Sequence, residues 1–180
     1  MEFFKKKYQL KIKFESYFQN IGMPFLNILK KIGISKNQIK INRDYIIESK
    51  KNKKKVKIYK GVKKTLKYLK KKENFLAVVT SKDKIRTKLL IKKYKLDFDY
   101  ISCPTKKLRG KPHPDQLNMV IKRLKVAKEK TIYLGDTKND YLAASRAGIK
   151  FYYASYGYGN LKKSKKFTQI NSIVGLKKFY

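Results

Sequence analysis

The pattern of hydrophobic and polar positions changes near residue 75 of the chain. Beyond it, short apolar runs of strand length alternate with segments whose apolar residues recur every three or four positions, which predicts strands followed by helices. The expected strands lie within 75–79, 100–102, 131–134 and 149–154, the expected helices within 81–94, 115–124 and 137–147, and a last strand and helix within 168–180. Ser81 is expected to be the N-cap of the helix within 81–94, with Ile85 and Leu89 on one face of that helix. The predicted fold class is α/β, a Rossmann-like parallel sheet with helices on both faces.

The part of the chain before residue 75 has a different pattern. Helical spacing of apolar residues predicts helices over Phe25–Ile32, Ile39–Ile47 and Val62–Leu69. Residues 8–14 alternate between apolar and polar positions, with lysine at every other position near the centre, which suits an edge strand or an amphipathic stretch. We therefore expect two units, a helical one over residues 1–57 and the α/β core over 58–180.

Composition gives the chain an unusual charge. Of its 180 residues, 48 are Lys or Arg and 12 are Asp or Glu, so the formal net charge is +36. Such a balance suits polyanionic partners, but five of the basic residues are arginine and the lysines are spread along the sequence. A lysine-rich solvated surface is the favoured interpretation, and nucleic-acid binding is the weaker alternative. The densest run, Lys50–Lys57, is expected to be an exposed connection.

The apolar runs, the first residues and the single cysteine bear on where the protein is located and on whether it forms disulfides. Hydrophobic residues make up 42 % of it, enough for a packed core, yet the longest apolar runs are too short to span a bilayer. The first lysines are not followed by an apolar stretch, so no signal peptide is predicted and a cytoplasmic location is expected. Cys103 is the single cysteine, which excludes an internal disulfide and a Cys-rich zinc site, and it is expected to be a small buried residue.

The strongest candidate for chemistry is the segment 135–140, Gly-Asp-Thr-Lys-Asn-Asp, directly after an apolar strand. Ligands of open α/β sheets bind at the carboxyl ends of strands, where Asp136 is expected. Asp140 follows in the first helical turn and can face the same crevice. Two carboxylates there suit a hard cation such as Mg²⁺, but a helix cap with an acid favoured by the dipole explains them equally well.

Two further segments carry candidate phosphate ligands. Thr80 and Ser81 end a strand and open a helix, where hydroxyls and free backbone N–H groups form an anion cradle, although an ordinary N-cap is the common alternative. Lys111 lies between a glycine and a proline, which would hold its charge in place beside a phosphoryl group. The nearby His113, the only histidine, is more simply structural than substrate-binding.

Together and in this order, these three motifs resemble the haloacid dehalogenase superfamily, most closely its phosphoglycolate phosphatase and β-phosphoglucomutase-like branch, from about residue 8 to residue 159. The resemblance implies that Thr80 or Ser81 holds phosphate, that Lys111 neutralises charge, and that Asp136 and Asp140 hold Mg²⁺. It also implies that residues 1–57 form part of a helical cap that selects a small phosphorylated metabolite, with Gly22-Met23-Pro24 as a loop facing the substrate.

The first motif of that family, a D-x-D-G-T segment whose first Asp attacks phosphorus, is missing from these 180 residues. Residues 97–99 read Asp-Phe-Asp but follow a helix and lack the Gly-Thr, so we do not expect them to replace it. The family's first strand lies between those that end at Ser81 and Asp136, so its loss leaves a gap unless these two pair directly. We expect a coding start upstream of Met1 or, less simply, a decayed gene. As it stands, the chain is predicted to be inactive, or a non-catalytic remnant that binds phosphate or Mg²⁺ or serves as a regulatory partner.

Overall fold

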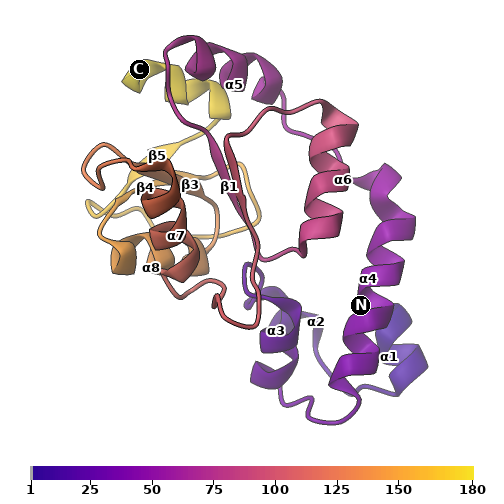
Figure 1. The fold of residues 1–180 in the computed structure, drawn as a ribbon. Coiled ribbons are helices and arrows are strands. Elements are labelled where there is room, and N and C mark those ends of the chain that lie inside the picture. The colour runs from indigo at the N-terminus through magenta and orange to yellow at the C-terminus, as the bar shows by residue number, and fades with distance from the viewer. Residues whose placement is uncertain (1) are drawn as a thin grey trace.

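The structure is a computed structural model, and it describes residues 2–180. Helices α1–α4 gather on one side of the molecule, strands β3–β5 lie on the other with α5 next to the C-terminal helix, and β1 and α6 lie between them (Figure 1). The elements before residue 75 are all helical: α1 (Glu2–Tyr8), α2 (Phe14–Phe18), α3 (Phe25–Lys31), α4 (Gln38–Lys51), the 3-10 helix η1 (Asn52–Lys55) and α5 (Val62–Lys71). The helices expected here are confirmed, but an edge strand over residues 8–14 is wrong, because helix α1 ends at Tyr8 and irregular chain follows.

The rest of the chain alternates between strands and helices, as predicted. Its elements are β1 (Ala77–Val79), α6 (Lys84–Tyr94), β2 (Tyr100–Ser102), α7 (Asp115–Leu124), β3 (Ile132–Gly135), α8 (Lys138–Ala147), β4 (Lys150–Ala154), β5 (Thr168–Ile170) and the 3-10 helix η2 (Ile173–Phe179). The expected N-cap of α6 is wrong: Asp83 takes that place, and its carboxylate accepts a hydrogen bond from the Arg86 N–H at 2.9 Å. Ile85 and Leu89 are exposed on this helix.

The strands form two separate parallel sheets. β1 pairs with β2, and β3 pairs with β4, which pairs with β5. The neighbours β1 and β3 do not pair directly, so one of the alternatives left open by the sequence is excluded. Among the residues described, their direct polar link is a long one, 3.5 Å from the Tyr133 hydroxyl to the Val79 carbonyl oxygen.

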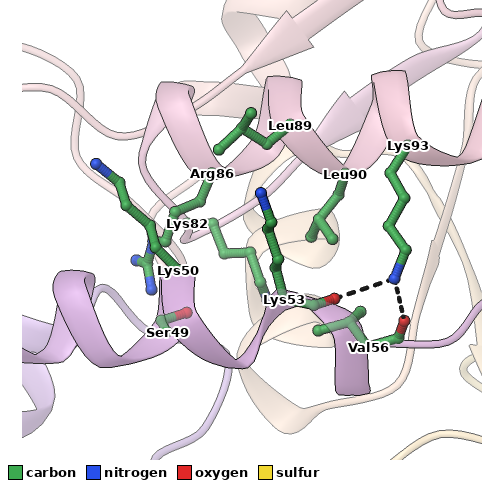
Figure 2. Close-up of a pocket in the computed structure, with 9 residues that line it drawn as sticks. All are labelled: Ser49, Lys50, Lys53, Val56, Lys82, Arg86, Leu89, Leu90 and Lys93. Atoms are coloured by element: carbon green, nitrogen blue, oxygen red, sulfur yellow. Dashed lines mark hydrogen bonds between the residues drawn. The ribbon is translucent and has the colours of Figure 1, made fainter.

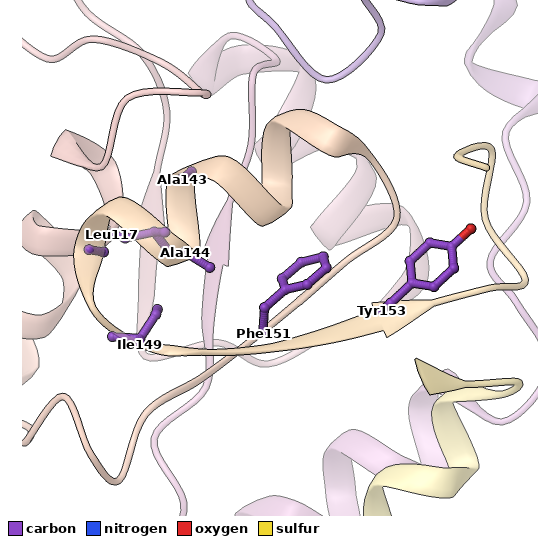
Figure 3. Packing of buried hydrophobic residues seen from close by; sticks show 7 residues of the cluster. Leu117, Ala143, Ala144, Ile149, Phe151 and Tyr153 are labelled. Carbon is purple, nitrogen blue, oxygen red and sulfur yellow. The ribbon is translucent and has the colours of Figure 1, made fainter. Parts of the chain in front are cut away.

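Helices cover both faces of the larger sheet. On one face, Phe151 and Tyr153 of β4 pack against alanines of α8 and against Leu117 of α7 (Figure 3). On the other, Tyr152 packs with residues of α5, β5 and η2. Neighbouring strand residues point to opposite faces, so one strand contributes to two cores. The α/β fold with helices on both faces is confirmed.

The N-terminal helices have a hydrophobic core of their own. Its buried members come from α1, α3, the turn after α3, and α4: Phe4, Phe25, Leu29, Ile34 and Ile41. The rings of Phe25 and Tyr45 stack with centroids 3.9 Å apart. We refer to residues 2–51 as the N-terminal helical unit. The boundary near residue 57 that the sequence suggests stays a prediction.

The chain's charged stretches lie on the surface. Residues 50–57 are nearly all exposed, as expected, although they belong to the end of α4 and to η1 as well as to a connection. Within residues 2–180, the helices are too short or too polar to cross a bilayer.

Candidate phosphate-binding site

A cavity of about 420 Å³ lies at the carboxyl ends of β1 and β3 and brings together all five residues singled out in the sequence. Thr80 and Ser81 follow β1, Asp136 follows β3, Asp140 comes from the first turn of α8, and Lys111 comes from the loop before α7. The opposite wall belongs in part to the N-terminal helical unit, and Gly22 and Met23 of the predicted loop line it. The two sheets therefore meet the helices at one hollow.

Lys111 is the buried cation of this cavity. Its Nζ lies 2.5 Å from Asp140 Oδ1 and 3.1 Å from the hydroxyl of Tyr133, and the Lys111 residue is 7 % exposed. Burial alone would lower the pKa of Lys111, but the adjacent Tyr133 and Asp140 groups outweigh it and the net shift is upward. Burial would likewise raise the pKa of Asp140, whereas Lys111 and the hydrogen bonds to Asp140 lower it. Both partners are consequently charged at neutral pH.

Asp140 uses both of its carboxylate oxygens within the protein. Oδ1 accepts hydrogen bonds from Lys111 and from the Tyr133 hydroxyl, the latter at 2.8 Å. Oδ2 accepts from the backbone N–H of Thr137 at 2.9 Å and from its hydroxyl at 2.6 Å. The Asp140 N–H in turn donates to Thr137 Oγ1 at 3.2 Å, which completes a capping box at the start of α8. The helix-cap interpretation of this acid is therefore correct, and a metal ion would have to displace one of these partners.

Asp136 is less engaged. Its Oδ2 accepts a hydrogen bond from the Tyr158 N–H at 2.7 Å, in the loop after β4. A Cβ at Gly159 would lie 1.6 Å from the Asp136 carbonyl oxygen, so only glycine allows that loop to approach so closely. A hard divalent cation needs about six oxygen ligands. Residues 2–180 hold no group of three acidic, histidine or cysteine side chains placed to bind a metal. Mg²⁺ usually keeps several of its waters and binds one or two protein carboxylates, so Asp136 would supply one ligand, while both oxygens of Asp140 are already engaged.

Thr80 and Ser81 have different roles in the structure. The Ser81 hydroxyl donates a hydrogen bond to the carbonyl oxygen of Gly22, and so fixes the 21–23 loop against the end of β1. The Thr80 Oγ1 accepts from the Lys82 N–H at 3.1 Å, which leaves its hydroxyl proton available to a ligand. Of the two hydroxyls, Thr80 is better placed to donate into the cavity.

Three features near the site were not anticipated from the sequence. Tyr133 contacts both Lys111 and Asp140. Its position two residues before Gly135 places it on the same face of the strand, and this spacing could have indicated from the sequence that it lies near the site. Gln116 is fully buried, and its amide nitrogen donates to the carbonyl oxygens of Thr80 at 3.1 Å and of Ser102 at 3.0 Å. It thereby fixes the carboxyl ends of β1 and β2, a tertiary role with no local signature. Arg86 also lines the cavity.

The remaining candidates lie elsewhere. His113 is not among the residues that line the cavity, in keeping with a structural role. Asp99 accepts a hydrogen bond from the Leu76 N–H at 2.6 Å at the amino ends of β1 and β2, the opposite edge from the cavity, so residues 97–99 do not occupy the place of a nucleophile. Cys103 is buried, with Sγ 3.7 Å from the Thr87 hydroxyl, as expected.

Comparison with known proteins shows the family and the fold of the chain. The sequence profile of the haloacid dehalogenase-like hydrolases matches residues 1–154. The chain belongs to that family. Among solved structures, a haloacid dehalogenase-like family hydrolase from Streptococcus pneumoniae superposes with a TM-score of 0.76 at 20% identity, over 98% of this chain and 85% of that one. A protein described as a predicted phosphatase from Clostridium acetobutylicum gives 0.80 at 23%, over 97% and 85%. These likenesses show the haloacid dehalogenase fold.

Among curated sequences of this family, phosphoglycolate phosphatases are similar to the chain. Phosphoglycolate phosphatase 1 of Pseudomonas aeruginosa is 33% identical over 105 residues, which cover 57% of this chain and 39% of that protein. The phosphoglycolate phosphatase of Pasteurella multocida is 33% identical over 103 residues, or 56% and 46%. The matched region thus spans less than half the length of these haloacid dehalogenase relatives.

Proposed function

We propose that the chain forms the phosphate-binding part of a phosphatase that acts on a small phosphate monoester, similar to phosphoglycolate phosphatases. One observation carries the proposal: the buried, charged Lys111 stands in a cavity at the carboxyl ends of β1 and β3. A fixed cation in a site of low dielectric stabilises a phosphoryl group more strongly than a solvated one does.

The other cavity residues suit the same ligand. Thr80 offers a hydroxyl donor, and the N-terminal helical unit closes the opposite side of the cavity and would act as a substrate-selecting cap. We expect the monoester to bind with its phosphoryl group between Thr80 and Lys111. The volume of about 420 Å³ suits a small metabolite.

Turnover requires a nucleophile, and residues 2–180 offer none at the cavity. Of the described residues that line the cavity, two are carboxylates, Asp136 and Asp140. Both oxygens of Asp140 are engaged in hydrogen bonds, and we expect Asp136 to bind a metal ion and not to attack phosphorus. Mg²⁺ belongs to the proposal through Asp136, and with a single such carboxylate we expect weak binding of the ion. The 180-residue chain should therefore bind a phosphate monoester without hydrolysing it.

Calorimetric titration with 2-phosphoglycolate tests the binding step, and the paired hydroxyls provide matched variants. Thr80→Val should weaken binding about tenfold, because a hydrogen bond to a charged phosphoryl group contributes about 1.5 kcal/mol. Ser81→Ala removes a hydroxyl that is already bonded to Gly22 and should weaken binding less. No saturable binding at millimolar ligand, or a larger loss in Ser81→Ala, would contradict the proposal.

A further inference from the structure

A second hollow lies beside the phosphate cavity, and Lys82 and Arg86 line both. It is a groove of about 160 Å³ between α6 and the segment formed by the end of α4 and η1 (Figure 2). Five cationic residues line it: Lys50, Lys53, Lys82, Arg86 and Lys93. No carboxylate is among the lining residues.

The charges of this groove are largely uncompensated. The ammonium of Lys93 donates to the carbonyl oxygens of Lys53 and Val56 at 3.0 and 3.1 Å, at the end of η1, so this cation has acceptors (Figure 2). Lys50, Lys53 and Lys82 form no ion pair with any residue of the part of the chain that the structure describes. Like charges gathered in one hollow repel each other, and a bound anion would relieve that repulsion.

Arg86 adds a second, independent sign of a ligand. Its side chain is 9% exposed, its guanidinium lies 4.9 Å from the centre of the Tyr45 ring, and its Nε donates to the Asp83 carboxylate. Its Nη1 is buried and has no hydrogen-bond partner. A buried donor without an acceptor is costly, and an anion in the groove would supply the acceptor.

The groove also has an apolar wall. Val56 and Leu89 are exposed at 40% and 41%, and Leu90 lies beside them on α6. The sequence pattern predicts that Leu89 and Ile85 share one face of the helix. In the structure, Leu89 lines this groove and is not buried in a hydrophobic core. Apolar side chains next to cations are the lining expected for a molecule with an apolar body and an anionic head.

We propose that this groove binds a small organic phosphate with an apolar body. Its phosphate would accept hydrogen bonds from Arg86 Nη1 and from the lysine ammonium groups, which approach from α4, η1 and α6, and its body would lie against Leu89 and Val56. Several donors from different directions suit a tetrahedral dianion. The small volume of the groove favours a metabolite over a peptide or a nucleic acid. The bound molecule would link the N-terminal helical unit to the core, and the site does not depend on the function proposed for the main cavity.

Calorimetry with n-butyl phosphate and methyl phosphate tests this inference. Butyl phosphate should bind about tenfold more tightly, because partial burial of three more methylene groups is favourable. Lys50→Gln/Lys53→Gln should weaken its binding about tenfold, whereas Lys128→Gln/Lys130→Gln, which removes the same charge from an exposed loop, should leave it unchanged. Leu89→Asn should remove the preference for the butyl group.

The two sites can be told apart by crossing variants and ligands. Lys50→Gln/Lys53→Gln should leave the binding of 2-phosphoglycolate unchanged. Butyl phosphate is also a phosphate monoester and can enter the main cavity, but Thr80→Val should leave unchanged the part of its binding that depends on Lys50 and Lys53. Equal affinity for butyl and methyl phosphate would overturn the groove proposal, as would equal losses in the two lysine pairs. Binding of RNA or of anionic vesicles that depends on Lys50 and Lys53, without binding of butyl phosphate, would overturn it in favour of a macromolecular partner.

Discussion

The β3–β4–β5 sheet and the β1–β2 sheet both carry site residues, but they are stabilised in different ways. In the larger sheet, four of the five β4 residues are buried, and helices pack on both of its faces. The β1–β2 pair has three residues in each strand, most of them only partly buried. Asp136 follows β3, which is itself only partly buried but pairs with the buried β4, whereas Thr80 follows a strand of the two-stranded sheet and depends on a few polar contacts.

Those contacts are side-chain bridges between the two sheets and their helices. Lys111, Tyr133 and Asp140 form the cluster nearest the gap, and Gln116 holds the ends of β1 and β2. Because the facing strands β1 and β3 are not paired, the rigidity of the site depends on these side-chain contacts. The following predictions test that dependence, from the largest expected effect to the smallest.

Lys111→Met should break the bridge most severely. It leaves the Asp140 carboxylate buried without its cation, and loss of one partner of a buried ion pair costs about 3–5 kcal/mol in the free energy of unfolding. Lys122→Met, which removes an exposed lysine from α7, is the control and should change stability little. Urea unfolding of both variants gives the comparison, and equal losses would show that the pair is not a structural bridge.

Gly135→Ala should disturb the end of β3. A Cβ there would lie 2.4 Å from the Cβ of Asp140, so the carboxylate must shift, and overpacking of this kind costs about 1–3 kcal/mol. Gly175→Ala is a matched control in η2, where the new Cβ would make an ordinary contact at 3.7 Å with Ile170. Thermal unfolding should separate the two variants, and similar melting temperatures would contradict the close approach at Gly135.

Gln116→Met should loosen the smaller sheet. The carbonyl oxygen of Thr80 would lose its donor inside the protein, and that of Ser102 would keep only the Thr80 N–H at 3.1 Å, at a cost of about 2 kcal/mol. The exposed Gln169→Met in β5 is the control. Amide hydrogen exchange should become faster in β1 and β2 while β3 and β4 keep their protection, and uniform acceleration in all four strands would refute a local role for Gln116.

The loss of stability at acidic pH should depend on the cluster of Lys111, Tyr133 and Asp140. The pKa of Asp140 is lowered in the folded protein, so its contribution to stability is present at neutral pH and is lost as the pH falls below about 4, where the unfolded carboxylate takes up a proton. Lys111→Met/Asp140→Asn should flatten the loss of stability between pH 5 and 3, as followed by urea unfolding at each pH. An unchanged slope would mean that other carboxylates account for acid sensitivity.

The larger sheet was also the part that local sequence predicted well. The apolar run of β3, the Thr137 and Asp140 positions of the capping box, and Gly148 at the end of α8 all act within a few residues of one another. The two strands of the smaller sheet were also predicted, but the N-cap of the helix that follows β1 was not, because a tertiary contact decides it. Ser81 bonds to Gly22, 59 residues away, and so leaves the N-cap of α6 to Asp83.

In the candidate site, too, local sequence predicted some features and tertiary contacts decided others. Its charged residues could be found because their motifs lie at strand ends, but the engagement of both Asp140 oxygens and the part played by Tyr133 depend on side-chain packing across the gap. In residues 8–14, the alternating pattern suited an edge strand or an amphipathic stretch. Tyr8, Leu10 and Ile12 do pack against the core of the N-terminal helical unit, but Tyr8 ends α1 and the other two lie in irregular chain and not in a strand.

The central claim is that the cavity binds a phosphate monoester but lacks the group that would attack phosphorus. The most direct test is the release of inorganic phosphate from saturating 2-phosphoglycolate, with Mg²⁺ present, by the 180-residue chain and by its Asp136→Asn variant. The account predicts no release above background by either protein, although the unmodified chain binds the ligand. Steady turnover by the unmodified chain that Asp136→Asn abolishes would contradict it.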